Sequence, residues 1–175
     1  KGEVWSSTGS QLTVKEYETR YIEEHVRHSN ALHSHTTEGG HYLVGPLARL
    51  NLNYEQLMPN AQKALKDAKI KLPIQNPYKS LIARAVELVH FYEEAIALIK
   101  AYQPTGPAHL ELKLKAGEGS GASEAPRGLL YHRYIIDDKG LVQFAKITPP
   151  TAQNTTMAPS NTRSERSTSA VKSTC

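Results

Sequence analysis

Five of the eight histidines of this 175-residue chain lie between His25 and His41, which makes a metal site conceivable there. Imidazole nitrogen binds zinc and nickel, and His33 and His35 flank a single residue. No acidic or cysteine ligand is interleaved at a fixed spacing, however, and solvated polar loops often collect histidines. We therefore predict a histidine-containing loop here and assign no metal ligands.

A glycine-rich run, GEGSG, contains Gly117, Gly119 and Gly121 and superficially resembles a loop that cradles phosphate. Pro126 follows five residues later, where a phosphate loop would open a helix, and no Lys or Ser/Thr occupies the required positions. A nucleotide site is therefore disfavoured. We expect these glycines to let the backbone pass close to another buried element.

The segment EAPRG, from Glu124 to Gly128, predicts a compact turn that carries a charged pair between two strands. On residue chemistry alone, Arg127 is a surface ion-pair partner of Glu124, and such a pair contributes little stability. The chain contains a single cysteine, Cys175, which excludes an internal disulfide and every paired-cysteine metal motif within it. We interpret Cys175 as a free thiol rather than a ligand.

The elements that must position these residues begin with helical patterns. Apolar residues spaced by three and four predict an amphipathic helix, and Ser, Asn, Thr and Gly clusters predict a loop after it. Proline is tolerated at the first position of a helix and marks further starts, and Asn76 is a suitable N-cap for the longest segment. The predicted helices span 14–28, a short stretch within 43–54, 59–69 and 77–102, with a loop at 29–40.

Strand patterns follow in the second half of the chain. The run HLELKLK, from His109 to Lys115, alternates strictly between Leu and polar residues. Two β-rich runs between Leu129 and Thr148 surround Asp138, Lys139 and Gly140, a hairpin signal. We predict an α+β fold with a mainly helical core and a small antiparallel β element in the C-terminal part. A helix over 77–102 would be roughly 39 Å long, so we expect an incomplete domain.

The last 23 residues, from Gln153 to Cys175, differ in composition, because ten of them are Ser or Thr. Such a segment buries too little apolar surface to offset its ordering entropy, and we expect it to be disordered. We therefore divide the chain into a partial domain at 1–152 and a divergent tail at 153–175.

Charge and hydropathy exclude two classes of partner. The net charge of +4 is mild and its Lys and Arg residues are spread along the chain, so we expect no nucleic acid partner. No window approaches the roughly 18 to 20 apolar residues of a membrane span. The first residues, Lys1 to Ser10, lack the apolar core of a signal peptide, and we expect a cytoplasmic protein.

Three segments resemble nickel–iron hydrogenase large subunits, in the order of that family. HYLVGPLARLNLNY, at 41–54, and NPYKSLIARAVELVH, at 76–90, match two of its segments, and 117–154 matches the stretch that carries EAPRG and the strand pair after it. The ending PPTAQN is similar to that of the cytoplasmic, bidirectional class that exchanges electrons with NAD(P) or coenzyme F420.

The resemblance implies a nickel–iron centre with cyanide and carbon monoxide on the iron. It implies that Arg127 is catalytic: its side chain projects over the open side of the two metals, donates a hydrogen bond to a cyanide and, as the neutral guanidine, takes the proton when H2 is split heterolytically. Ala125 and Pro126 would place main-chain groups beside the diatomic ligands, and Thr151 would place its hydroxyl near a cyanide. The implied partners are an iron–sulfur small subunit and a diaphorase-type electron-transfer module.

The chain also departs from that family. It has neither of the two CxxC pairs that hold the metals, nor the family's proton-transferring glutamate or C-terminal histidine. One explanation is that the chain is an interior fragment, starting at Lys1 rather than Met, with a reading-frame shift after Asn154. We then expect no tight metal binding by this chain alone. The alternatives are a nickel-free relative, such as the quinone-module subunit of complex I, which usually has Lys in place of Arg127, or a degenerate non-catalytic scaffold.

Overall fold

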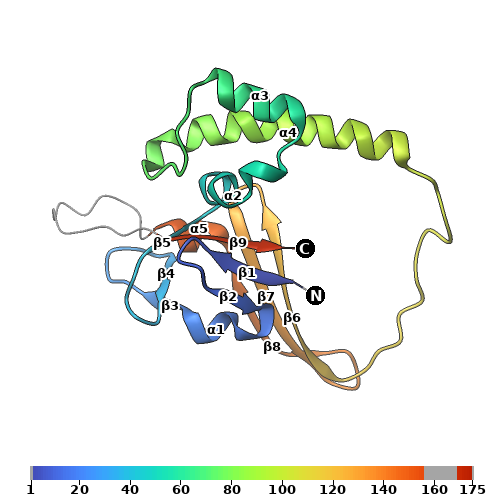
Figure 1. Ribbon diagram of the computed structural model, residues 1–175. Coiled ribbons are helices and arrows are strands. Elements are labelled where there is room, and N and C mark those ends of the chain that lie inside the picture. The colour runs from blue at the N-terminus through green and yellow to red at the C-terminus, as the bar shows by residue number, and fades with distance from the viewer. Residues whose placement is uncertain (1, 156–168, 175) are drawn as a thin grey trace.

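The computed structural model describes residues 2–155 and 169–174. Figure 1 shows a helical layer, formed by α3 and α4, above a β-rich part, with α2 between them. In the described part of the chain the strands form three sheets, with strand orders β2-β1-β9-β5, β3-β4 and β6-β7-β8. The helices are α1 (Tyr17–Arg20), α2 (Pro46–Asn53), α3 (Pro59–Asp67), α4 (Ser80–Ala101) and α5 (Pro150–Asn154), with 3-10 turns at Val14–Glu16, Tyr54–Gln56 and Pro77–Lys79.

The four-stranded sheet joins the two ends of the described chain. Its strands are β1 (Glu3–Ser6), β2 (Gln11–Thr13), β5 (Tyr42–Val44) and β9 (Ser169–Thr174), where β1 is antiparallel to β2 and β9, and β5 is parallel to β9. The expected disorder of the tail therefore fails at 169–174, because β9 pairs on both sides and Val171 is fully buried. Residues 156–168 and Cys175 lie outside the described residues, so the expectation for them stays a prediction.

The expected helix at 14–28 is mostly wrong. A 3-10 turn and α1 together end at Arg20, and β3 (Tyr21–His25) then pairs antiparallel with β4 (Leu32–Thr36) inside the segment predicted as a loop. Tyr17 and Tyr21, four residues apart, are both buried, and their spacing led to the prediction of a helix. The strand forms because a partner outside the helical window is available: Tyr21–His25 pairs residue for residue with Leu32–Thr36.

The other predicted helices are confirmed. Pro46 and Pro59 open α2 and α3, and the side chain of Asn76 accepts a hydrogen bond of 3.0 Å from the backbone amide of Tyr78 ahead of α4. A second core lies where these helices meet. It contains Leu47, Leu50, Leu57, Ala61, Leu65, Ile74, Ala83 and Val86.

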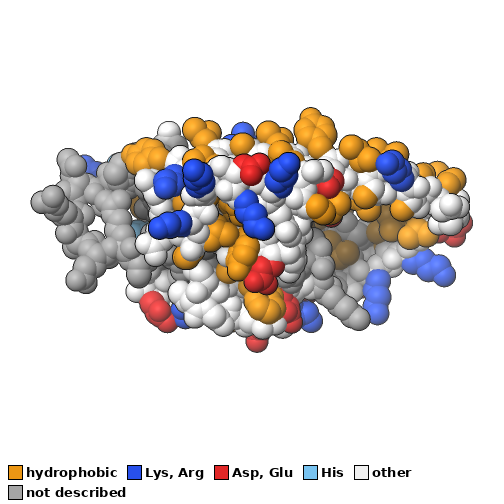
Figure 2. Space-filling view, turned by 45° about the horizontal axis from the view of Figure 1, so that its top comes forward, with side chains coloured by type: hydrophobic (Ala, Val, Ile, Leu, Met, Phe, Trp, Pro, Cys, Tyr) orange, Lys and Arg blue, Asp and Glu red, His pale blue; other side chains and the backbone are white. Residues whose placement is uncertain are grey.

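Helix α4 is the longest element, and much of its apolar surface is exposed. Phe91, Ile96 and Ile99 are 48%, 54% and 74% exposed, and Figure 2 shows apolar side chains along this helical layer. Its burial is confined to a small set of positions, including Ala83 and Val86. None of the described helices is long and apolar enough to cross a membrane.

The three-stranded sheet consists of β6 (Gly117–Ala125), β7 (Gly128–Ile136) and β8 (Val142–Thr148), all antiparallel. The hairpin around Asp138 to Gly140 is confirmed. The strand expected at His109 to Lys115 is wrong, because this segment has no partner and Leu110 and Leu112 are 81% and 89% exposed. Strand β6 contains the GEGSG glycines instead.

Those glycines do not approach a buried element. A Cβ atom added to Gly117, Gly119 or Gly121 would meet nothing within 4 Å. The fold is a mixture of helix and sheet, as expected, but strands occupy both ends of the described chain and do not simply follow the helices.

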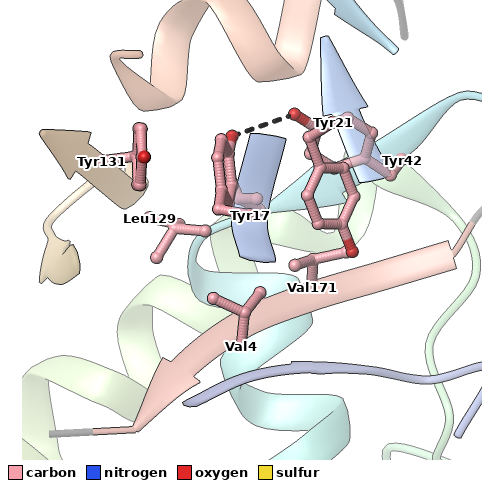
Figure 3. Close-up of a cluster of buried hydrophobic side chains, with 8 residues drawn as sticks. Val4, Tyr17, Tyr21, Tyr42, Leu129, Tyr131 and Val171 are labelled. Carbon is pink, nitrogen blue, oxygen red and sulfur yellow. Dashed lines mark hydrogen bonds between the residues drawn. The ribbon is translucent and has the colours of Figure 1, made fainter. Parts of the chain in front are cut away.

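One core holds the two larger sheets together, and four of its side chains are tyrosines (Figure 3). The rings of Tyr17 and Tyr131 stack with centroids 4.2 Å apart, and the hydroxyl oxygens of Tyr17 and Tyr42 lie 3.5 Å apart. We call this cluster the tyrosine core. Its members are Val4, Tyr17, Tyr21, Tyr42, Val44, Leu129, Tyr131 and Val171.

Burial in the tyrosine core makes stability depend on alkaline pH. It raises the pKa of Tyr21 to about 12 and also raises the pKa of Tyr17 and of Tyr42. In the unfolded chain these phenols lose their protons at about pH 10, so the folded chain binds more protons above that value. The contribution of these tyrosines to stability should therefore be constant below pH 10 and fall as the pH rises from 10 through 12.

This prediction is checked by urea unfolding at a series of pH values, together with phenolate absorbance. In urea all tyrosines should ionise at about pH 10, whereas the folded chain should show a separate late group. A single ionisation step near pH 10, with the circular dichroism of the folded chain unchanged, would contradict it.

Candidate functional site

The EAPRG turn connects β6 to β7. Ala125 and Gly128 form the last register pair, so Pro126 and Arg127 occupy the turn, and both are exposed. The ion pair between Arg127 and Glu124, which residue chemistry alone would allow, is not formed, and Glu124 Oε2 lies 2.7 Å from Arg49 Nη1 instead. Among the described residues none forms an ion pair with Arg127. Its guanidinium is therefore presented at the surface of this part of the molecule.

Arg49, on α2, lies behind the turn and holds it through three groups. Its Nη1 donates to Glu124 Oε2 and to the carbonyl oxygen of Ala125, at 2.7 and 3.0 Å. Its Nη2 donates to the carbonyl oxygen of Pro126 at 3.1 Å. The backbone on the N-terminal side of Arg127 is thus bound to α2.

Glu87, on α4, orients the same guanidinium from the other side. Its two carboxylate oxygens accept from Arg49 Nε and Nη2 at 2.7 and 3.0 Å, a bidentate pair. The side chains of Arg49 and Glu87 are only 12% and 9% exposed. Burial by itself would lower the pKa of Arg49, but the hydrogen bonds and charge of Glu87, then those of Glu124, raise it overall. Arg49 therefore stays cationic.

A close backbone contact fixes the C-terminal side of the turn. Gly45 and Gly128 both have positive φ, of 102° and 134°, and each faces the other's backbone. A Cβ on Gly128 would lie 2.5 Å from Val44 Cγ2 and 2.7 Å from the amide nitrogen of Gly45, and a Cβ on Gly45 would collide with the carbonyl oxygen of Arg127. Both positions therefore require glycine.

Helix α5, the PPTAQN segment, supplies the third support. The Oδ1 of Asn154 accepts from the amide of Val44 at 2.9 Å, and its Nδ2 donates to the carbonyl of Arg127 at 3.3 Å. The neighbouring Gln153 is fully buried and donates to the carbonyl of Leu129 at 2.6 Å. Thr151 lies in the same helix but is exposed. The role expected for its hydroxyl is not tested by these contacts and stays a prediction.

Residues that sequence reasoning missed therefore surround the residues it found. Arg127, Ala125 and Pro126 were recognised as one motif, whereas Arg49 and Glu87 were not singled out. The signal was present only indirectly, because both lie inside the segments at 41–54 and 76–90 that carry the resemblance. Their separation of 38 residues gives no spacing pattern by which the pair could be recognised.

The histidines do not form a metal site. Among the described residues no group of three or more His, Cys, Asp or Glu side chains could hold a metal ion. The rings of His28 and His33 meet edge to face at 5.5 Å, and His35 Nε2 lies 3.5 Å from a carboxylate oxygen of Glu24. The segment is a hairpin with surface pairs rather than a ligand set.

An apolar hollow of about 980 Å³ lies away from the turn, between α2, α3 and the segment at 70–75. Leu47, Leu65 and Ile70 are among its lining residues, and neither Arg127 nor Arg49 contributes to it. The polar, charge-bearing turn is therefore the better candidate for chemistry.

In sequence, the chain is similar to subunits of known hydrogenases. No protein-family model matches the chain. Sulfhydrogenase 1 subunit alpha of Pyrococcus furiosus is 34% identical over 161 residues, which cover 90% of this chain and 37% of that protein. The beta subunit of the NAD-reducing hydrogenase HoxS of Cupriavidus necator is 35% identical over 129 residues, covering 67% of this chain and 25% of that protein. The chain thus spans well under half of the length of these relatives.

A solved structure of an NAD+-reducing NiFe hydrogenase in its H2-reduced state has a similar fold. It matches with a TM-score of 0.68 and 23% identity over 89% of this chain and 37% of the other. The chain is therefore homologous to hydrogenase subunits, and its fold resembles that of a nickel–iron hydrogenase chain.

The contact between Gly45 and Gly128 leads to a prediction for stability. Gly128→Ala should destabilise the chain by roughly 3 kcal/mol, because a Cβ there combines unfavourable φ with overlap against Val44. Gly119→Ala is the matched control in the paired strand, where a Cβ meets nothing, and it should change stability by less than about 0.5 kcal/mol. Urea unfolding of the two variants measures both values, and equal losses would show that the close contact is not formed.

Proposed function

We propose that this chain is an interior segment of the catalytic large subunit of a nickel–iron hydrogenase, the enzyme that cleaves H2 reversibly. One observation carries the proposal: the segments of 41–54, 76–90 and 117–154 converge on the EAPRG turn. Arg49, Glu87 and Asn154 hold that turn from behind, and Arg127 is left exposed on it. A buried framework that fixes an exposed cationic turn supports a role for Arg127 in chemistry rather than in stability.

The role proposed for Arg127 is to hold a guanidinium and its fixed N–H donors at the edge of a reaction centre. A planar guanidinium remains charged at all physiological pH values and offers donors in a rigid fork. Donors fixed by the protein beforehand stabilise developing negative charge without reorganisation. The carbonyl oxygens of Ala125 and Pro126 accept hydrogen bonds from Arg49, and these bonds hold the turn rigid.

This chain does not have the ligands that the two metals need. Nickel and low-spin iron in this family require soft thiolate ligands, and the chain has only Cys175. The CxxC ligand pairs would have to come from parts of the polypeptide outside these 175 residues. A reading-frame shift after Asn154 stays a proposal for the changed composition. The pairing of β9 with β1 and β5 does not favour it, and CxxC codons in the flanking DNA would support it.

An iron–sulfur small subunit and an electron-transfer module are the proposed partners, and NAD(P) or F420 the proposed acceptor. The related subunit of an NAD-reducing hydrogenase favours NAD(P) over F420. The second candidate function is that of a nickel-free relative or a degenerate scaffold. The lack of cysteine in residues 1–174 favours it, whereas an arginine at position 127 favours the hydrogenase.

The purified chain should bind no nickel tightly and should not reduce methyl viologen under H2, because it lacks thiolate ligands. Elemental analysis after dialysis against nickel and a viologen assay measure this. Stoichiometric zinc without iron would favour the scaffold alternative, and H2-dependent viologen reduction by the chain alone would contradict the fragment assignment.

In the complete hydrogenase that contains this segment, Arg127→Lys should lower the rate of H2 oxidation by about 10²- to 10³-fold, as loss of a fixed donor at a charged transition state does. Metal content should be unchanged, since Arg127 is not a ligand. Arg20→Lys is the control, because the ion pair of Arg20 with Glu38 is exposed and includes no residue of the EAPRG turn. Full activity of Arg127→Lys would refute the proposed function.

A further inference from the structure

The guanidinium of Arg49 uses its whole hydrogen-bonding capacity at one place. An arginine side chain has five N–H donors, and the structure provides five contacts for them. Two go to Glu87, one to Glu124, and two to the consecutive carbonyl oxygens of Ala125 and Pro126. No donor is left for solvent, so the side chain has a single satisfied orientation.

The two carbonyls that Arg49 binds belong to the peptide groups immediately before Arg127. Fixing two consecutive peptide planes fixes the backbone from which the Arg127 side chain departs, because only φ and ψ rotate freely. The third carbonyl, that of Arg127 itself, accepts from Asn154 and packs on Gly45. All three carbonyl groups of the turn are therefore engaged.

Charge supports the same geometry. Two carboxylates, Glu87 and Glu124, flank the guanidinium of Arg49, and their side chains are 9% and 18% exposed. Their hydrogen bonds to Nε, Nη1 and Nη2 hold the guanidinium in the plane from which it donates to the turn carbonyls.

We infer that Arg49 is the positioning residue for Arg127: it touches no substrate and acts by fixing the backbone of the EAPRG turn. This inference rests on the proposed function for its catalytic meaning, but the effect on the turn can be measured without any activity. Lysine should replace Arg49 only in part, because it keeps the charge but has three donors and no planar fork.

The test uses amide hydrogen exchange on the full chain. In Arg49→Met, exchange at Gly128, which pairs with Ala125 at the end of β6 and β7, should accelerate by roughly 10- to 100-fold, as the loss of two hydrogen bonds predicts. Arg49→Lys should give a smaller increase. Arg133→Met is the matched control, because Arg133 also pairs with two carboxylates, Glu18 and Glu118, but binds no turn carbonyl. It should leave exchange at the turn unchanged.

Unchanged exchange at the turn in a folded Arg49→Met would overturn the inference, as would an equal increase in Arg133→Met. If Arg49→Met does not fold, Arg49→Lys decides the question, since it keeps the cation that the carboxylates require. In the complete enzyme, Arg49→Lys should lower kcat for H2 oxidation while KM for the electron acceptor stays constant. A loosened turn with an unchanged kcat would also overturn the positioning role.

The two proposals fail in different ways. If the unsubstituted complete enzyme shows no H2 turnover, the proposed function is wrong, and the exchange data still decide whether Arg49 fixes the turn. If turnover is present but Arg49 has no influence on the turn, only this inference is wrong.

Discussion

The buried ion cluster of Arg49, Glu87 and Glu124 is the interaction on which the arrangement of the candidate site depends. It joins α2, α4 and the end of β6. Among the described residues, neither apolar core contains buried residues from all three of these elements. Burying such charges is costly unless each is paired and hydrogen-bonded, and here the guanidinium is fully satisfied. Removing Arg49 would leave the buried carboxylate of Glu87 without its bidentate partner, a loss of about 3–5 kcal/mol. Because burying these charges is costly, the cluster is better explained by its fixing of the EAPRG turn than by a contribution to stability alone.

Two cores with different chemistry meet at this cluster. The tyrosine core joins the two larger sheets through the stacked rings of Tyr17 and Tyr131, and the hydroxyl groups of Tyr17 and Tyr42 pair within it. The helical core around Leu47 and Leu50 is aliphatic. Helix α2 belongs to both regions, because Gly45 at its start touches β7 while its leucines face α3 and α4. The EAPRG turn is thereby held against the helical layer and the sheet together.

The sequence predicts the elements whose signals are local. Proline at the first helical position located α2 and α3, the apolar period located α4, and a turn signal located the hairpin of β7 and β8. It fails where a partner distant in sequence decides the structure. Residues 21–25 have helical spacing but pair with β4, HLELKLK alternates but has no partner strand, and β9 forms because two strands accept it. Arg49 could not be found for the same reason, since its acceptors lie 38 and 75 residues away.

The exposed apolar side chains of α4 are relevant to the proposal that this chain is a fragment. A helix of 22 residues with Phe91, Ile96 and Ile99 exposed to solvent is poorly suited to form the outer surface of a domain. Exposed apolar patches of this kind normally mark a contact surface. The chain also spans only 37% of a relative that matches 90% of it. Under the fragment proposal, one cause accounts both for a segment that fixes the EAPRG turn without thiolate ligands and for a helix without a covering layer. The scaffold alternative must explain them separately, and it gives no reason for a buried framework that serves only the backbone beside Arg127.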